Sequence, residues 1–420
     1  MNLLRFFRNL AKLASTVVES VVFDGPEEDS EVTADVRPQG RGPLCGTCGR
    51  GAVRLHGQQM KERRWRHLGA FGRVVWLRAK VVRLLCSRCG VRTMLVPWAR
   101  TGSMFTRAFE DEVAWFVQHT DKTATAGYFG VAWKTVGNIA TRVVEEKLDR
   151  SLLKGLQVIG VDEICYGRPL KYLTVVVNLL TGKVIWSGEG QSSSTLKRFF
   201  DEIGAAERLS IAVVAMDMDP AFEKAVCEQI PHARVVYDRF HVVKLLNDAI
   251  DEIRRDLMRE FIDEPDFRKA LKGSRWSLLK NPWNLTRRQR EKLAAVAARN
   301  KGLYRAYLLK ETFQEIFGAS NVDQADDLFA QWYAWATRSQ LAPMMRVART
   351  MKSHWSGIRA FIELGFTNGP VEGYNSKIRM LSHRAFGFHS AAALIAMIHL
   401  CCSGVTITPA GHGRPQLHTL

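Results

Sequence analysis

The sequences LQVIGVDE at residues 156–163 and IAVVAMD at residues 211–217 decide the fold. Both runs are short, apolar and rich in β-branched residues. The runs YLTVVVN at 172–178, KVIW at 183–186 and ARVVYD at 233–238 have the same character. Runs of this length and composition are typical of buried strands rather than amphipathic helices. Together with a polar, helix-like segment at 192–203, they predict an α/β core built on a mixed sheet.

Three of these runs reach an aspartate, namely Asp162, Asp217 and Asp238. We expect each aspartate at the last residue of its strand, at the sheet edge where ligands of open α/β sheets bind. Carboxylates placed side by side raise the free energy of the folded state unless a cation shares the site. The sequence therefore predicts a metal site at this edge.

The charge balance points to a polyanionic partner. The 420 residues contain 60 Lys and Arg against 42 Asp and Glu, a formal net charge of +18. Nucleic acid is the first candidate for such a partner, and a merely basic soluble protein is the alternative. No apolar run reaches the roughly 18 residues that a membrane span needs, so we expect no membrane association and a cytoplasmic protein.

The N-terminal residues predict no sorting signal. Residues 1–22 are amphipathic, and they contain Glu19 and lack a small-residue cleavage site. This pattern favours a docking helix over a signal peptide. The polar residues 27–42, with Pro and Gly, predict a linker.

Two CxxC pairs predict a zinc site. Cys45 with Cys48 and Cys86 with Cys89 each form a tight turn that directs two thiolates at one point. Four sulfurs from two such turns suit tetrahedral Zn²⁺, as in a zinc ribbon. The other four cysteines have no framework spacing, which favours a reducing compartment. Between the pairs, basic residues alternate with apolar ones and predict a strand with a basic face that contacts the DNA backbone; the alternative is a purely structural zinc domain. These basic residues are Arg63, Arg64, Arg66, Arg73, Arg78 and Lys80.

Residues 105–148 predict a helix-turn-helix. Helical periodicity covers 105–118, a short segment 123–128 comes next, and a glycine turn at 129–130 leads into 132–148. The last helix has an apolar face and an opposite polar face, which suits base reading in a major groove. Any small helical bundle is the alternative. The apolar face contains Val136, Ile139 and Val143, and the polar face contains Lys134, Asn138 and Arg142.

From residue 245 to about 355 the pattern is helical, basic and aromatic, and it predicts an all-helical insertion. Its tryptophans are expected in the core, with base stacking by one of them as the alternative. These tryptophans are Trp276, Trp283, Trp332 and Trp335.

The sequence TNGPVEGYNSKIR at 367–379 then predicts a turn into a helix with Pro370 in its first turn. Glu372 lies in the first turn of this helix, where an acidic residue could simply complement the helix dipole. A helical pattern resumes at 389–400, and the tail from Gly404 is expected to be loosely ordered.

The combination of these motifs, from about residue 45 to 400, resembles bacterial insertion-sequence transposases of the DDE type, in the zinc-ribbon branch often called ISL-three. The resemblance implies an RNase H-like core. It also implies a domain order. That order is an N-terminal segment and linker (1–40), a zinc-binding domain (41–100), a helix-turn-helix (101–150), the first part of the core (151–245), a helical insertion (246–355), the second part of the core (356–405) and a tail (406–420).

The resemblance further implies a catalytic triad of Asp162, Asp217 and Glu372, which hold two Mg²⁺ (or Mn²⁺) ions for phosphodiester cleavage and strand transfer. Asp238 is the alternative to Asp217 as the second catalytic aspartate, and a purely structural role for it would be to cap the following helix. His241 could contact phosphate or the active site, or serve as a core or capping residue.

Two further acidic residues are not favoured. Asp219 precedes Pro220 at a helix start, and Glu163 points to the other face of its strand.

The implied partner is double-stranded DNA, both the terminal inverted repeats and the target. Lys377 and Arg379 would face its backbone, and synapsis of two ends would need a homodimer or larger assembly. Two rivals remain: a catalytically inactive DNA-binding regulator, and an RNase H-like nuclease without strand transfer.

Overall fold

The computed structural model forms two compact units. One contains Met1–Asp149 with Leu381–Leu420, and the other contains Arg150–Met380. None of the described helices is long and apolar enough to cross a membrane. The structure describes residues 3–24, 31–40, 42–51, 54–57, 60–70, 72–167, 169–385, 387–388 and 390–409.

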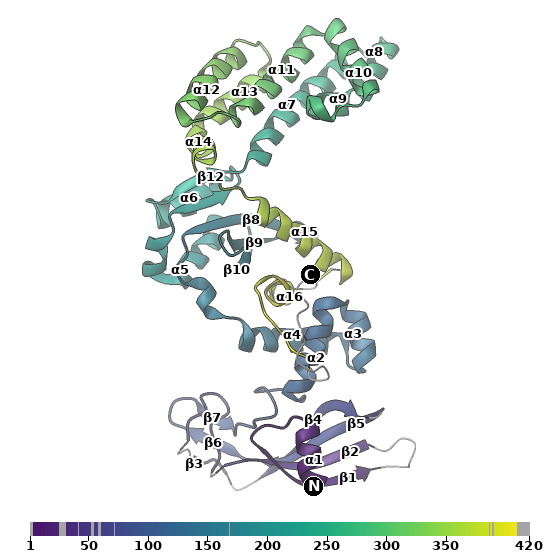
Figure 1. The fold of residues 1–420 in the computed structure, drawn as a ribbon, viewed down its shortest axis with the longest axis vertical. Helices are drawn as coiled ribbons and strands as arrows, with labels where there is room; N and C mark the ends of the chain where they lie inside the picture. Colours follow the sequence, from purple (N-terminus) through teal and green to yellow (C-terminus); the bar gives the residue numbers. More distant parts are fainter. Residues whose placement is uncertain are drawn as a thin grey trace. The chain divides into compact units, whose positions relative to one another are not determined.

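The first unit begins with a sheet of which the sequence predicted only the basic strand region at 63–80. Helix α1 (Leu3–Leu10) is followed by β1 (Thr16–Asp24) and β2 (Glu31–Pro38). These strands join β5 (Arg73–Val81) and β4 (Lys61–Ala70) in the order β1-β2-β5-β4, with β2 parallel to β5 (Figure 1).

The docking helix predicted over 1–22 is therefore confined to α1, with β1 after it, and the linker predicted over 27–42 is wrong for Glu31–Pro38, while residues 27–30 and 41 lie outside the described residues. Val32, Ala34 and Val36 are buried at the two-residue spacing of a strand, and Thr33 is buried as well. The charged outer residues of β2 made it resemble a polar linker.

A second, three-stranded sheet carries the cysteine pairs. It consists of β3 (Arg54–Leu55), β6 (Arg83–Cys86) and β7 (Gly90–Thr93), in the order β3-β6-β7. The hairpin of β6 and β7 begins its turn at Cys86 and closes it with Gly90, whose φ of 71° suits glycine. This turn holds the second CxxC pair.

Three helices come next, as the sequence predicted. They are α2 (Arg107–His119), α3 (Lys122–Phe129) and α4 (Trp133–Lys147). Thr106 and Asp121 cap the first two with their side chains, and Gly130 ends α3 in the left-handed region.

The C-terminal helix α16 (Ala391–Cys402) packs against α2 and α4. The expected second part of the core, 356–405, is thus divided between the two units at residues 380 and 381. Helix α16 is apolar on nearly all sides, which predicts burial but not the surface that buries it.

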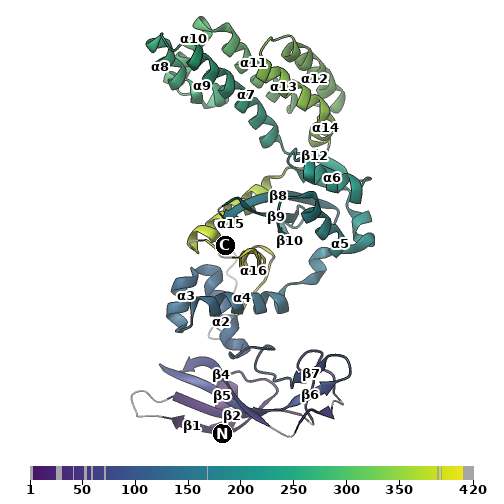
Figure 2. The same cartoon turned by 180° about the vertical axis from the view of Figure 1, so that it is seen from behind.

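The second unit is built on a five-stranded mixed sheet. Its order is β10-β9-β8-β11-β12, in which β8, β9 and β10 are antiparallel and β11 and β12 run parallel to β8. Figure 2 shows the sheet from behind. The strands are β8 (Val158–Gly167), β9 (Lys171–Asn178), β10 (Lys183–Glu189), β11 (Val213–Met216) and β12 (Arg234–Tyr237).

Helices cover both faces of this sheet. Ile159, Val161 and Val214 pack in the core shared with α5 (Ser193–Ser210) and α6 (Pro220–Gln229). On the opposite face, four strand residues pack with residues of α14 (Trp355–Leu364). They are Val158, Val213, Ala215 and Val236. A mixed sheet between helices confirms the predicted RNase H-like core.

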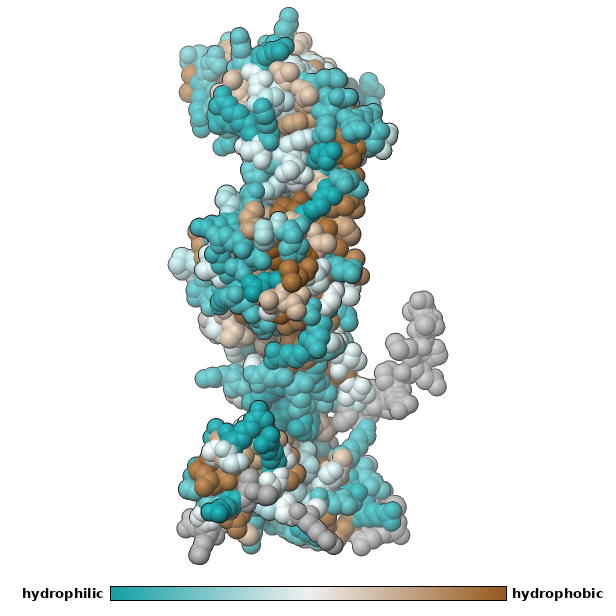
Figure 3. Space-filling model, turned by 90° about the vertical axis from the view of Figure 1, so that its left-hand side faces the viewer, coloured by the Kyte–Doolittle hydropathy of each residue, from teal (hydrophilic) through white to brown (hydrophobic). Residues whose placement is uncertain are grey.

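Between Arg239 and Leu364, a stretch described in full, the chain is helical, as predicted. Hydrophilic side chains cover much of the insertion on the face in Figure 3. Trp332 is buried in its core, but Trp276, Trp283 and Trp335 are exposed, so the core prediction is wrong for those three. The elements are α7 (Arg239–Glu260), α8 (Pro265–Gly273), α9 (Arg275–Leu279), the 3-10 turn η2 (Pro282–Asn284), α10 (Arg287–Arg299), α11 (Lys301–Ile316), α12 (Val322–Thr337) and α13 (Ala342–Ser353).

Candidate functional site

The register of the parallel strands brings three aspartates level with one another. Strand β11 pairs Ala215 with Gly160 of β8, and Met216 with Tyr237 of β12. Continued to the next residues, these registers place Asp217 beside Asp162 on one side and beside Asp238 on the other. By strand alternation, all three side chains lie on the sheet face that α14 covers.

Asp162 lies within its strand, so the prediction that it ends the strand is wrong. Strand β8 continues to Gly167 because its antiparallel partner β9 continues with it, and Asp162 is opposite Val175. The parallel pairing with β11, in contrast, stops at Gly160. Asp162 therefore still lies beyond the last paired residue of the parallel half. Asp217 and Asp238 come directly after β11 and β12, as predicted.

Gly160 lets helix α15 (Gly369–Arg384) approach β8 closely. A Cβ atom at this position would lie 2.5 Å from Val371 Cγ2 and 2.8 Å from Asn368 Oδ1. Asn368 is fully buried, and its Nδ2 lies 3.4 Å from the carbonyl oxygen of Val161. The absent side chain thus places the first turn of α15, with Glu372, over the face that carries Asp162.

Asn375, for which no role was predicted, contacts the site directly. Its Nδ2 donates to Asp162 Oδ2, while the backbone N–H of Glu163 donates to Asp162 Oδ1 at 2.8 Å. Asn375 lies three residues after Glu372, which puts both on one side of α15. That spacing was the available signal. The Oδ1 atom of Asn375 is buried without a hydrogen-bond partner in the part of the chain that the structure describes.

His241, on the first turn of α7, joins the other two aspartates. Its Nδ1 lies 2.6 Å from Asp217 Oδ1 and 3.3 Å from Asp238 Oδ2. Asp238 also accepts a hydrogen bond from the backbone N–H of Phe240 at 3.3 Å and so caps α7, as its structural alternative predicted. Burial alone would lower the pKa of His241, but the contacts with Asp217 and Asp238 raise it to about 10. The imidazole is therefore protonated at neutral pH and offsets part of the local negative charge.

The remaining acids are harder to ionise than usual. Burial and the negative charge of Asp217 raise the pKa of Asp162 to about 6. Burial and the charge of Asp162 raise the pKa of Glu163 to about 7. Burial and the charges of Asp238 and Asp217 also raise the pKa of Glu372, against the opposing charge of His241. Burial is the largest cause of each shift, and the negative charges of neighbouring carboxylates add to it.

The donor set fits a divalent cation. Ligand atoms of Asp217, Asp238 and His241 all lie within 4.8 Å of one another, a group that does not include Asp162 or Glu372. Because the protonated imidazole has no free lone pair, the two carboxylates are the cation donors of this group. Carboxylate oxygens are the hard ligands that such ions prefer, and a cation would relieve the repulsion that raises these pKa values. Asp219 takes no part in this cluster, because it caps α6 through the N–H groups of Ala221 and Phe222.

The four predicted zinc ligands form a second cluster, in the first unit. The sulfur atoms of Cys45, Cys48, Cys86 and Cys89 all lie within 4.8 Å of one another, and Cys48 Sγ is 3.7 Å from Cys86 Sγ. Four sulfurs at the usual Zn–S length of about 2.3 Å are separated by about 3.8 Å in a tetrahedron.

Backbone N–H groups of Cys48 and Thr47 lower the pKa of Cys45 to about 6. Burial and the neighbouring thiols raise that of Cys89 to about 12. Four thiolates therefore require a cation here, and the residues fit Zn²⁺.

Comparison with known proteins gives the family. A transposase family model matches residues 159–398, a helix-turn-helix model of transposase family ISL3 matches 95–144, and a zinc-finger model of the transposases of IS204, IS1001, IS1096 and IS1165 matches 41–89. The chain belongs to the ISL3 family of transposases.

Relatives and a solved structure are similar to it to different extents. The transposase of insertion sequence element IS1557 from Mycobacterium tuberculosis is 36% identical and aligns over 99% of this chain and 100% of its own length. The transposase of IS1001 from Bordetella parapertussis is 29% identical over 84% of this chain and 87% of its own. The simian T-cell lymphotropic virus intasome in complex with a PP2A regulatory subunit matches 42% of this chain and 70% of its own at 18% identity, with a TM-score of 0.16. That score is too low to say anything about the fold.

In the helix-turn-helix of this ISL3 transposase, α4 presents two of the three predicted base-reading residues. Lys134 and Asn138 are exposed. Arg142 instead donates to Glu110, which is fully buried and also binds Arg100. Arg142 therefore has a structural role in this unit through its ion pair with a buried carboxylate, and a reading role for it stays a prediction.

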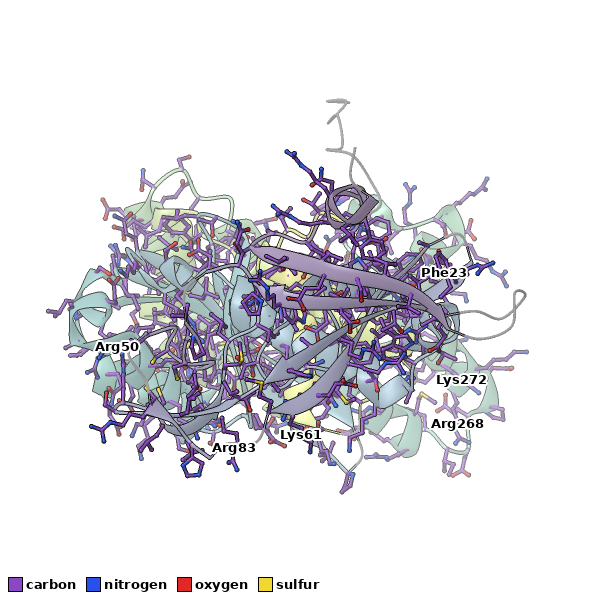
Figure 4. The ribbon with its side chains drawn as sticks, turned by 90° about the horizontal axis from the view of Figure 1, so that it is seen from below. Phe23, Arg50, Lys61, Arg83, Arg268 and Lys272 are labelled. Atoms are coloured by element: carbon purple, nitrogen blue, oxygen red, sulfur yellow. The ribbon has the colours of Figure 1, made fainter. Side chains whose placement is uncertain are left out.

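The predicted basic face of the β4–β5 hairpin is partly neutralised. Arg78 on β5 pairs with Asp35 at 2.6 Å, and Arg64 on β4 pairs with Glu31 at 3.1 Å. Both acidic partners belong to β2, a strand that the sequence did not predict. Other basic side chains of this region are exposed and extend outward in Figure 4, namely Arg50, Lys61 and Arg83. In the second unit, Lys377 and Arg379 are exposed on α15.

Proposed function

We propose that this ISL3 transposase binds the terminal inverted repeats of its insertion sequence, cleaves the DNA ends and joins them to target DNA. Asp162, Asp217 and Glu372 are the catalytic residues. The observation that supports this most directly is the common register of β8 and β11 on the face over which Gly160 seats α15.

Asp217 is a better second carboxylate than Asp238. Neighbouring strands lie about 4.8 Å apart, so Asp217 is one strand from Asp162 and Asp238 is two strands away, at about 10 Å. Two catalytic ions are about 3.5–4 Å apart, and one ligand must bridge them. A carboxylate on the adjacent strand suits that distance. Asp238 already caps α7 with one oxygen and faces His241 with the other.

Mg²⁺ or Mn²⁺ held by these carboxylates would lower the pKa of an attacking water and stabilise the leaving oxygen. The side chains around the triad have positioning roles. Asn375 fixes the carboxylate of Asp162, because its amide N–H holds one oxygen while the backbone N–H of Glu163 holds the other, and each oxygen keeps a lone pair for a cation. His241 holds Asp217 through its protonated ring and keeps the cluster folded before a metal binds.

The first unit supplies DNA recognition in this proposal. Lys134 and Asn138 read base edges, while Arg50, Lys61 and Arg83 contact phosphates. Lys377 and Arg379 face the DNA backbone near the cleaved bond. Two ends must be held together for joining, which requires at least a homodimer on DNA, associated with the bacterial nucleoid in the cytoplasm.

The deciding experiment incubates the purified full chain with Mg²⁺ and a labelled duplex that ends in the terminal repeat. We expect nicked products and products joined to a second duplex. Nicking without joining would favour the nuclease, and specific binding without nicking would favour the inactive regulator.

A matched control separates catalysis from folding. Asp162→Asn should abolish both products while specific end binding persists. Asp219→Asn retains a residue that caps helices equally well and should leave both products unchanged. Equal losses in both variants would contradict the assignment of Asp162.

A further inference from the structure

The helical insertion exposes two tryptophans close together in the chain. Trp276 on α9 is 59% exposed, and Trp283 on η2 is 72% exposed. Exposed rings of this size forgo the burial of roughly 150–250 Å² that each offers. Neither residue has a role in the proposed active site. Their exposure indicates a surface that binds a partner.

Hydrogen bonds from buried side chains fix the backbone that carries these rings. Lys310, which is fully buried, donates to the carbonyl oxygens of Leu278 at 2.9 Å and Lys280 at 3.2 Å and pairs with Glu311 at 2.7 Å. The hydroxyl of Ser274, also fully buried, donates to the carbonyl oxygen of Leu271 at 2.8 Å. A buried cation placed at the end of α9 keeps the segment between the two tryptophans in one conformation. The rings are therefore presented in place rather than on a loose loop.

The segment that carries the rings is strongly basic, although Arg275 lies 3.4 Å from Asp251 of α7. Residues 265–301 contain eleven Lys and Arg against two acidic residues. Arg268 and Lys272 are exposed on α8 and extend outward in Figure 4. The guanidinium of Arg275 lies 5.2 Å from the Trp276 ring centre.

Helix α12, in the same insertion, has the opposite character. It contains three aspartates and no Lys or Arg, and it carries the less exposed Trp335. The positive charge is thus concentrated where the two rings are exposed.

We propose that this surface, formed by α8, α9, η2 and the start of α10, binds DNA with unpaired bases. The basic side chains attract the phosphates, and Trp276 and Trp283 stack on successive bases. An acidic protein would use the charges but leave both rings exposed. An apolar protein partner would not need so many cations around the rings. Binding at this surface requires neither the carboxylates nor metal, and it adds a second DNA-binding surface to the proposed function.

The first test is local. The full chain, without divalent metal, is mixed with a single strand that contains 5-iodouracil, and excess unlabelled duplex occupies the helix-turn-helix. After irradiation, we expect mass spectrometry to place cross-links on Trp276 or Trp283. Cross-links confined to other parts of the chain would overturn the proposal.

The second test measures the contribution of the rings to affinity. Trp276→Ala with Trp283→Ala should weaken binding of the strand at least about 30-fold, since stacking contributes about 1–3 kcal/mol per base and two bases lose their partner ring. Binding of an abasic strand with the same phosphates should be unchanged, as should binding of both strands by Trp335→Ala. No loss for either strand would show that charge alone binds it, and an equal loss for both would show that the rings act through something other than base stacking; either result would overturn the proposal. Because both rings are exposed, the double variant should keep the thermal unfolding temperature of the wild type. These expectations do not depend on cleavage, so a chain that fails to cleave DNA should still show them.

Discussion

The cysteine cluster and the carboxylate cluster are both suited to metal, but the chain assembles them in opposite ways. The four thiols come from two tight turns, each of which places its pair by local geometry. The acids lie on β8, directly after β11 and β12, and on α15, and they span residues 162–372. A zinc centre of this kind is encoded by spacing, whereas the acidic site is encoded by strand register and by one close helix approach. A substitution that removes metal from one site should therefore leave the other site intact.

The largest expected effect separates the two aspartates of the acidic cluster. Asp217→Asn should reduce end cleavage by at least about 10³-fold, because losing a charged group in the reaction centre costs no less than losing one hydrogen-bond donor to a transition state. Asp238→Asn retains a helix-capping side chain and should cost less than tenfold. Cleavage of the labelled terminal-repeat duplex is the measurement. Reversed results would transfer the catalytic role to Asp238.

The second prediction concerns the cysteine cluster. Cys45→Ser should release zinc and weaken specific end binding about 10- to 100-fold, because its metal and local fold form together. Colorimetric zinc release and gel shifts measure the two effects. The Asp217→Asn chain provides the matched comparison and should retain zinc and end binding. Loss of zinc with unchanged affinity would remove this domain from recognition.

The third prediction tests the close approach at Gly160. Gly160→Ala should lower the free energy of unfolding by about 1–3 kcal/mol and reduce cleavage, because the added Cβ meets Val371 and Asn368. Gly373, on the same helix α15, has open space around it, so Gly373→Ala should instead stabilise by about 0.5–1 kcal/mol. Chemical denaturation measures both. A harmless Gly160→Ala would show that α15 is not seated by this contact.

The smallest effect is a pH dependence confined to the acidic site. With a pKa of about 6 in the folded chain, Asp162 is protonated below that pH and must lose its proton to bind a cation. Mn²⁺ affinity should therefore be constant above pH 7 and fall up to tenfold for each unit below about 6. Calorimetry at several pH values measures it. An affinity that stays level down to pH 5 would show that Asp162 is not a ligand.

The features that local pattern encodes were largely predictable from the sequence. The CxxC pairs, the three helices up to α4 and the strands that lead to Asp217 and Asp238 all have short-range signals, and the structure confirms them. Asp162 was misplaced within its strand because only the antiparallel partner β9 reveals how far β8 continues. The roles of Gly160 and Asn375 depend on α15, which is more than 200 residues distant from β8 in the chain.

Other errors have the same origin. The ion pair of Arg142 with Glu110 was missed because this buried partner lies on another helix. Strand β2 was missed because its outer residues, among them Glu31 and Asp35, bear charges that pair with β4 and β5. In each case the deciding contact joins elements whose proximity no local pattern specifies.

The central claim is that β8 and β11 share one divalent ion beneath α15. Anomalous diffraction from a crystal of the full chain soaked in Mn²⁺ tests this claim most directly. The account predicts a manganese peak between the carboxylates of Asp162 and Asp217, with Glu372 within reach of the metal. A manganese peak held only by other residues, or none at this cluster, would contradict it.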